Sequence, residues 1–147
     1  MKKNQEKIYT ILIGGQAGDG AREAGVNLAR LFCKLGYYVF ASMEYPSLIR
    51  GGHNFCRVSF SKEKIYSDYR ELDAIIALNQ ETADLHKNEL KKSGVIFFDN
   101  NINSIIGKSG QLISLPITSY AKELSAPSLA RTAVALGAFC RYYDLSL

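Results

Sequence analysis

The chain alternates between short apolar runs and a segment in which apolar residues recur at helical spacing. Residues 8–13 form a continuous, β-rich apolar run, which is typical of a strand buried on both faces. Residues 20–35 carry an apolar stripe of one helical face, and Gly36 follows as a stop. Residues 37–43 then predict a second strand. Together these segments predict a strand–loop–helix–strand unit in which the two strands run parallel.

The rest of the chain continues this alternation. Residues 54–61 alternate apolar and polar side chains, which predicts a half-exposed strand that pairs with residues 65–67 as a hairpin. Buried strands are predicted at residues 73–79 and 95–98, and a further strand at residues 111–115. Helices are predicted at residues 80–92, 119–124 and 128–143, with Gly94 ending the first of them. The sequence therefore predicts an α/β fold: a mostly parallel sheet flanked by helices, with one hairpin.

The last predicted helix, residues 128–143, is apolar on almost every side. Such a helix must be covered all round, either inside this fold or by a partner chain. Small residues such as Ala133 and Gly137 would let another backbone approach closely. We favour a partner chain, and a homodimer is plausible when the protein is isolated.

Length and composition narrow the class of protein. A chain of 147 residues suits one domain spanning residues 1–147, and 47% hydrophobic residues argue against disorder. The net charge of +4 is spread along the chain, which does not favour nucleic-acid binding. Since no apolar run reaches membrane-spanning length and no signal peptide is evident, we expect a cytoplasmic protein.

The three cysteines do not indicate a metal site. They lie far apart in the sequence and form no CxxC pair and no cluster with histidine, so neither zinc nor an iron–sulfur cluster is expected in this chain. All three have apolar sequence neighbours, and we therefore expect them to be small buried side chains.

The first candidate site is the glycine-rich loop between the first strand and the first helix. Its candidate residues are Gly15, Gln16, Gly18 and Gly20. Glycines permit a tight turn and let backbone N–H groups approach a ligand at the helix N-terminus. The glycines could also serve only to turn the chain and to let the helix pack on the strand.

Known cofactor motifs fit this loop poorly. The glycine spacing fails the GxGxxG dinucleotide pattern, the only acid placed to hold a ribose is Glu44, and no Lys-Ser/Thr pair completes a P-loop. Gly18-Asp19-Gly20 and Asn100-Asn101 spell the two ends of a thiamine diphosphate motif. Some eighty residues separate them where thiamine enzymes have about thirty, so we reject that interpretation.

The second candidate site follows the second strand and contains Arg50, Gly51, Gly52 and His53. The carboxyl ends of parallel strands are where ligands and partners gather in open α/β sheets. Arg50 offers a planar fork for a carboxylate or phosphate, and His53 offers a titrating imidazole. The segment could equally be a surface loop with an exposed arginine. We expect this motif and the glycine loop to lie on neighbouring edges of one face.

Taken in order, the two motifs resemble a known family. The glycine loop, the helix, the "GYYV" strand and "EYPSLIRGGHNFCRVSFS" resemble the gamma domain of the 2-oxoacid:ferredoxin oxidoreductases, particularly the 2-oxoglutarate and branched-chain type. The resemblance is strongest over residues 8–61, and "LPITSYAKEL" and "ARTAVALGAF" extend it in the same order. Relatives often have Gln in place of Asp19 and Asn in place of Thr132, and they continue past the last helix, so this chain is expected to be a truncated or naturally short form.

The resemblance implies a division of labour. These enzymes oxidatively decarboxylate a 2-oxoacid, such as pyruvate or 2-oxoglutarate, with coenzyme A and pass the electrons to ferredoxin. Thiamine diphosphate, Mg²⁺ and the iron–sulfur clusters would reside in companion alpha, beta and delta subunits, with no catalytic residue or metal in this chain. Arg50 would pair with a carboxylate of the substrate or of a partner. A stand-alone dinucleotide- or flavin-binding protein and a noncatalytic assembly module remain alternatives.

Overall fold

The computed structural model of the chain describes residues 7–44, 52–102, 110–124 and 127–145, with side-chain surroundings in the last range given from residue 130 onward. In chain order the elements are β1 (Tyr9–Gln16), α1 (Ala21–Lys34), β2 (Tyr38–Glu44), β3 (His53–Ser61), β4 (Leu72–Ala77), α2 (Gln80–His86), a 3-10 turn η1 (Lys87–Glu89), β5 (Leu90–Asp99), β6 (Gln111–Leu115), α3 (Ile117–Lys122) and α4 (Pro127–Tyr142). The predicted α/β fold is confirmed.

The strands form a single sheet in the order β2-β3-β1-β4-β5-β6. β4, β5 and β6 each pair parallel to the preceding strand of the sheet, starting from β1. β3 runs antiparallel to both of its neighbours, β1 and β2. The expected parallel direction of β1 and β2 is therefore confirmed, but β3 lies between them.

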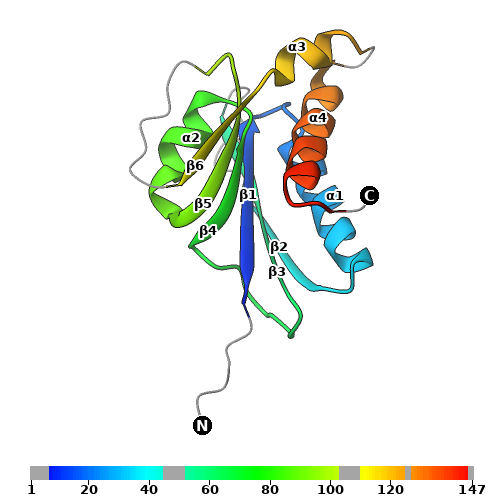
Figure 1. Cartoon of the computed structure of the whole chain (residues 1–147), viewed down its shortest axis with the longest axis vertical. Coiled ribbons are helices and arrows are strands. Elements are labelled where there is room, and N and C mark those ends of the chain that lie inside the picture. Colours follow the sequence, from blue (N-terminus) through cyan, green and yellow to red (C-terminus); the bar gives the residue numbers. More distant parts are fainter. Residues whose placement is uncertain (1–6, 45–51, 103–109, 125–126, 146–147) are drawn as a thin grey trace.

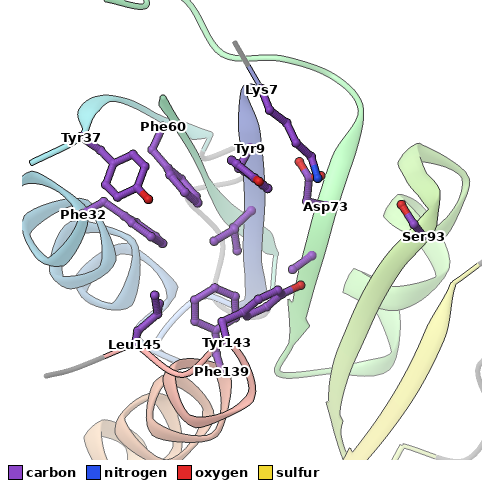
Figure 2. A pocket seen from close by; sticks show the side chains of 12 residues that line it. Lys7, Tyr9, Phe32, Tyr37, Phe60, Asp73, Ser93, Phe139, Tyr143 and Leu145 are labelled. Atoms are coloured by element: carbon purple, nitrogen blue, oxygen red, sulfur yellow. The ribbon is translucent and has the colours of Figure 1, made fainter. Parts of the chain in front are cut away.

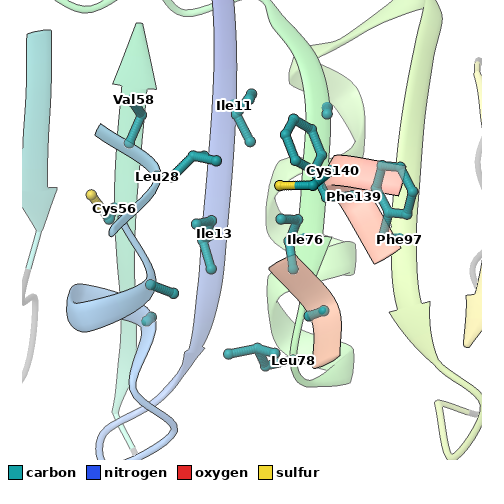
Figure 3. Close-up of a cluster of buried hydrophobic side chains, with 14 of the residues drawn as sticks. Ile11, Ile13, Leu28, Cys56, Val58, Ile76, Leu78, Phe97, Phe139 and Cys140 are labelled. Carbon is teal, nitrogen blue, oxygen red and sulfur yellow. The ribbon is translucent and has the colours of Figure 1, made fainter. Parts of the chain in front are cut away.

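Helices cover the two faces of the sheet unequally. α1 and α4 lie on one face and α2 lies on the other (Figure 1). The larger core lies under α1 and α4, where Leu28 and Phe139 pack against β-strand residues such as Ile13 and Ile76 (Figure 3). These side chains are almost completely buried, which is the main source of stability for such a sheet.

The prediction for β3 was wrong in two respects. The strand is buried on both faces because its polar side chains have partners: Arg57 pairs with Glu89, and the Ser59 hydroxyl lies 2.9 Å from that of Thr10. Residues 65–67 form no strand, so the predicted hairpin there is absent. The antiparallel partner that follows β2 directly in the chain is β3 itself.

The boundary between α2 and β5 also differs from the prediction. α2 ends at His86, and β5 begins at Leu90, so Gly94 lies within a strand and does not end a helix. An added Cβ at Gly94 would lie 2.7 Å from the Leu90 side chain and 3.0 Å from the Asp73 carbonyl oxygen. Gly94 is therefore required by close packing inside the sheet.

α4 packs against this fold on one side. Ala135, Phe139 and Cys140 are buried, whereas Ala133 is exposed. The alternative in which the helix is covered inside the fold is thus correct for its inner face, and coverage of the outer face by a partner stays a prediction. Leu129 lies in α4, but its side chain is outside the described part.

Two of the three cysteines are buried as expected, and burial raises the pKa of the Cys56 thiol to about 11. Cys33 is exposed, which contradicts the expectation for that residue. No helix within the described ranges has the length and apolar character needed to cross a membrane.

Candidate functional site

The glycine loop lies at the carboxyl end of β1, where the chain turns into α1 (Figure 1). Gly18 and Gly20 have φ values of 102° and 81°, which lie in the left-handed region that disfavours other residues. Gly20 is the N-cap of α1 and supplies no side chain to it. The loop sequence is therefore dictated first by the turn itself.

The Asp19 side chain folds back onto this loop, where it contacts Gln16 and lies close to Gly15. Its side chain is paired on both oxygens: the Gln16 backbone N–H donates to Oδ2 at 3.0 Å, and Arg131 Nη1 donates to Oδ1 at 2.8 Å. Gly15 has no room for a side chain because its Cβ would lie 2.7 Å from Asp19 Oδ2. The carboxylate accepts from the Gln16 backbone N–H and places a negative charge at this loop, so the loop is not an open phosphate cradle.

Arg131 is a residue of this candidate site that the sequence did not indicate. From α4 it reaches Asp19 after β1, donates to the carbonyl oxygen of Leu78 after β4, and lies 3.9 Å from the carboxylate of Asp99 at the end of β5. Asp99 in turn accepts from the Thr118 backbone N–H at 3.1 Å, at the start of α3. One guanidinium thus joins the carboxyl ends of three parallel strands, and its sequence signal is an arginine near the start of a mostly apolar helix.

Asp19 and Thr132, where the resemblance leads us to expect Gln and Asn in many relatives, both lie at this loop. Asp19 is buried beside Arg131, and Thr132, the next residue of α4, has its Cγ2 3.3 Å from the Cβ that a side chain at Gly20 would carry. The negative charge of Asp19 beside the helix is paired with the Arg131 guanidinium.

The structure brings the second motif to the same edge of the sheet. Gln16 of β1 lies opposite His53 of β3, and the Ala17 backbone N–H donates to the Gly52 carbonyl oxygen at 3.0 Å. Residues Arg50 and Gly51 are outside the described part of the chain. For Gly52 and His53, the expected proximity to the glycine loop is confirmed, and the ligand or interface role stays a prediction.

His53 is buried at this edge and contacts a second histidine. Its Nε2 lies 3.0 Å from Nε2 of His86 in α2, and its ring stacks on Phe55 with the centroids 5.3 Å apart. The pKa of His53 lies below the ordinary value of 6.5, chiefly because burial penalises the charged ring and secondly because His86 is adjacent; Glu81 acts in the opposite direction.

The lowered pKa of His53 predicts a pH-dependent stability. In the window below 6.5 and above the folded-state pKa, the unfolded chain binds more protons than the folded one, so stability falls as the pH falls. For one proton the slope reaches at most about 1.4 kcal/mol per pH unit. Urea unfolding across this window measures it. The His53→Gln variant keeps an amide toward His86 but does not titrate there, and a slope equal to that of the wild type would contradict the prediction.

The sheet order weighs against the dinucleotide alternative. A ribose-binding acid belongs at the end of the parallel strand that neighbours β1. Glu44 does end β2, but β3 separates that strand from β1, and Glu44 lies opposite Phe55 of β3. The described part of the chain also has no group of three or more His, Cys, Asp or Glu that could hold a metal ion.

A cavity of about 400 Å³ lies at the opposite end of β1, between the ends of α1 and α4 (Figure 2). Its walls are mainly aromatic, and Phe32 stacks on Phe60 there. Burial, followed by the neighbouring Tyr142, Asp73 and Tyr9, raises the pKa of Tyr143 to about 12. Tyr143 is therefore a neutral phenol at physiological pH, and this cavity carries none of the residues singled out from the sequence.

Among curated proteins, the chain is similar to long alpha subunits. It is 27% identical over 115 residues to subunit alpha of 2-oxoacid:ferredoxin oxidoreductase 2 from Aeropyrum pernix, covering 78% of this chain and 18% of that protein. It is 27% identical over 123 residues to ketoisovalerate oxidoreductase subunit VorA from Methanothermobacter thermautotrophicus, covering 83% of this chain and 26% of that one. The chain thus spans about a fifth to a quarter of the length of these relatives.

Among solved structures, a keto/oxoacid ferredoxin oxidoreductase gamma subunit from Geobacter sulfurreducens matches with a TM-score of 0.84 and 27% identity, covering 96% of this chain and 79% of that one. The 2-oxoglutarate:ferredoxin oxidoreductase of Magnetococcus marinus, solved with 2-oxoglutarate, coenzyme A and succinyl-CoA bound, also gives 0.84 at 25% identity, covering 97% and 25%. Residues 10–147 match the family described as pyruvate ferredoxin/flavodoxin oxidoreductase. The chain belongs to this family.

Proposed function

We propose that this chain is the gamma-type subunit of a multisubunit 2-oxoacid:ferredoxin oxidoreductase. The observation that carries the proposal is the match to a gamma subunit over 96% of this chain and 79% of that subunit, because it concerns a chain of similar extent. The matched alpha subunits are several times longer, which agrees with a gamma domain that is free in some enzymes and fused in others.

The reaction of the complex would be oxidative decarboxylation of a 2-oxoacid with coenzyme A, giving acyl-CoA, carbon dioxide and reduced ferredoxin. Thiamine diphosphate, Mg²⁺ and iron–sulfur clusters would be held by companion alpha, beta and delta subunits in the cytoplasm. This division is supported by the candidate site itself, where the acid of the glycine loop is already paired with Arg131. Such a site suits docking better than cofactor chemistry.

The face that carries the glycine loop and the segment Gly52–His53 would dock against the catalytic subunits. Ala17, after β1, and Gly52, before β3, are joined there by a backbone hydrogen bond. Arg50, three residues before His53 in the sequence, would pair with a carboxylate of the substrate or of a partner subunit. This surface could govern subunit assembly or the access of coenzyme A.

Co-purification tests the proposal. The tagged chain is expressed together with the genes that adjoin its own, and the captured proteins are identified by mass spectrometry. We expect a thiamine-binding beta subunit and a ferredoxin-like subunit, with oxoacid-dependent ferredoxin reduction by the complex and none by the isolated chain. Turnover of an oxoacid by the isolated chain would contradict the proposal. A tightly held dinucleotide or flavin would instead support the stand-alone alternative.

Arg50→Ala then tests the docking face within that complex, with Arg30→Ala on the exposed side of α1 as the matched control. We expect weaker assembly or at least tenfold lower turnover for Arg50→Ala, since loss of one charged hydrogen-bonded partner costs about 1.5–3 kcal/mol. The control should behave as the wild type. Unchanged turnover and unchanged assembly with Arg50→Ala would remove this role and leave subunit membership intact. Captured partners without activity would favour a noncatalytic assembly module.

A further inference from the structure

A chain of side-chain contacts runs across the α2 face of the sheet from Arg57 to His53. Arg57 Nη2 donates to Glu89 Oε2 at 2.8 Å, Glu89 Oε1 lies 3.0 Å from Nδ1 of His86, and Nε2 of His86 lies 3.0 Å from Nε2 of His53. Arg57, His86 and His53 are at most 9% exposed, and the Glu89 side chain is 16% exposed. Four polar side chains with little solvent exposure are therefore linked by direct contacts.

The charges in this chain of contacts balance when both imidazoles are neutral. Arg57 supplies one positive charge and Glu89 one negative charge. Around His53 the further ionisable groups are His86 and Glu81 of α2, and Glu81 is exposed to solvent. Protonating His53 would add a buried charge that no carboxylate in direct contact within the described part of the chain compensates, and the lowered pKa of His53 agrees with this.

The hydrogen-bond donors then follow in sequence. A carboxylate only accepts hydrogen bonds, so Nδ1 of His86 carries the proton that points at Glu89. A neutral His86 with a proton on Nδ1 has a bare Nε2, which must accept from the facing nitrogen. That nitrogen is Nε2 of His53, so Nδ1 of His53 is the bare one.

We propose that Arg57, Glu89 and His86 are positioning residues that hold His53 in the Nε2–H tautomer and thereby fix its Nδ1 as a bare acceptor beside the glycine loop. This nitrogen is buried and has no hydrogen-bond partner among the atoms of the described ranges. The His53 ring adjoins the end of β1, since its Cε1 lies 3.2 Å from the Cβ that a side chain at Gly14 would carry.

The bare Nδ1 of His53 limits the kind of group that can pair with it. A bare imidazole nitrogen takes a hydrogen bond from a hydroxyl, thiol or N–H group and repels the unprotonated oxygens of a phosphate or carboxylate. The burial of this nitrogen also penalises a charged donor. Any group that pairs with this nitrogen must therefore be a neutral donor, and none lies there within the described ranges. This inference concerns the tautomer in the protein alone and does not depend on the proposed function.

Nitrogen NMR of the full chain with ¹⁵N-labelled histidine tests the proposal directly, because the chain contains 2 histidines and hence four ring nitrogens to assign. Near neutral pH we expect protonated Nδ1 and bare Nε2 for His86, and the reverse for His53. His53 found with a protonated Nδ1, or as an imidazolium, would overturn the proposal.

Two variants distinguish between the effect of the contacts from Arg57 to His53 and the effect of a nearby charge on the His53 tautomer. His86→Ala removes the acceptor, so His53 should lose its single tautomer and show exchange-averaged nitrogens. Glu81→Gln removes a nearby charge that is not part of the chain of contacts from Arg57 to His53, and it should leave the tautomer of His53 unchanged. If His86→Ala does not fold, the wild-type spectrum alone decides. Addition of inorganic phosphate should leave Nδ1 of His53 unshifted, and a saturable shift would overturn the neutral-donor preference.

Discussion

Replacing Arg131 by Met should lower the free energy of unfolding by about 3 kcal/mol, because the change leaves a buried carboxylate without its countercharge. Asp19 is 7% exposed and Asp99 is 1% exposed, and both face this guanidinium. The Met side chain retains most of the apolar stem, so the loss reports the charge and its hydrogen bonds. Urea unfolding monitored by circular dichroism measures the difference.

The same helix offers a matched control for this prediction. Arg141 also pairs with an aspartate, Asp144, but the two side chains are 85% and 95% exposed. Arg141→Met should therefore leave the urea midpoint unchanged, since exposed ion pairs contribute little. In the Arg131→Met background, Asp19→Asn should recover part of the stability by removing the stranded charge. Equal losses for the two arginine variants would contradict the role given to Arg131.

The second large effect is expected at Gly25, where α1 approaches β3 most closely. A Cβ at this position would lie 2.2 Å from Cys56 Sγ and 2.6 Å from Cys56 Cβ. Gly25→Ala should therefore destabilise the protein by about 1–3 kcal/mol through overpacking, despite the better helix propensity of alanine. The measurement is again the free energy of unfolding in urea.

Gly137 provides the opposite case in a helix of the same fold. An added Cβ there meets nothing within 4 Å, so Gly137→Ala should stabilise the protein by about 0.5–1 kcal/mol. Combining Gly25→Ala with Cys56→Ala removes the sulfur contact, and the double variant should lose less than the sum of the two single losses. A shift of the same sign for both glycine variants would show that the packing of α1 on β3 is not the cause.

Elements whose burial has one simple pattern could be predicted from the sequence. The apolar stripe over residues 20–35 corresponds to α1 at Ala21–Lys34, and the β-rich run over residues 8–13 lies within or beside β1. In both cases most of the side chains that face the core are apolar, so the local pattern predicts the element. The parallel direction of β1 and β2 followed instead from the helix that connects them.

β3 shows where the same reasoning fails. Ser59 and Arg57 look solvent-facing in the sequence, but each is buried against a polar partner that lies on another element. Such pairing joins residues far apart in the chain, and a local pattern does not reveal it. The position of β3 between β1 and β2 is hidden for the same reason, since strand order depends on pairings between distant segments.

The candidate site was predicted in part. The glycine loop and Gly52–His53 were found because glycines and an exposed-looking histidine interrupt the regular pattern. The supporting residues Arg131, His86 and Glu89 could not be found, because each acts from a different element across the sheet edge or its α2 face. The only available signal was an arginine near the start of a mostly apolar helix, and the same helix carries a second arginine near its end.

The position of β3 between β1 and β2 also determines which strands separate together in local unfolding. β2 is hydrogen-bonded only to β3 within the sheet, and β3 is held to the parallel strands through β1 alone. Separation of the β1–β3 ladder would therefore release β2 and β3 together as one cooperative unit, while β1, β4, β5 and β6 keep their own ladders. The β1–β3 ladder ends at the pair Gln16–His53. Local opening of β2 and β3 would therefore change the candidate docking face, while the hydrogen bonds among β1, β4, β5 and β6 stay intact.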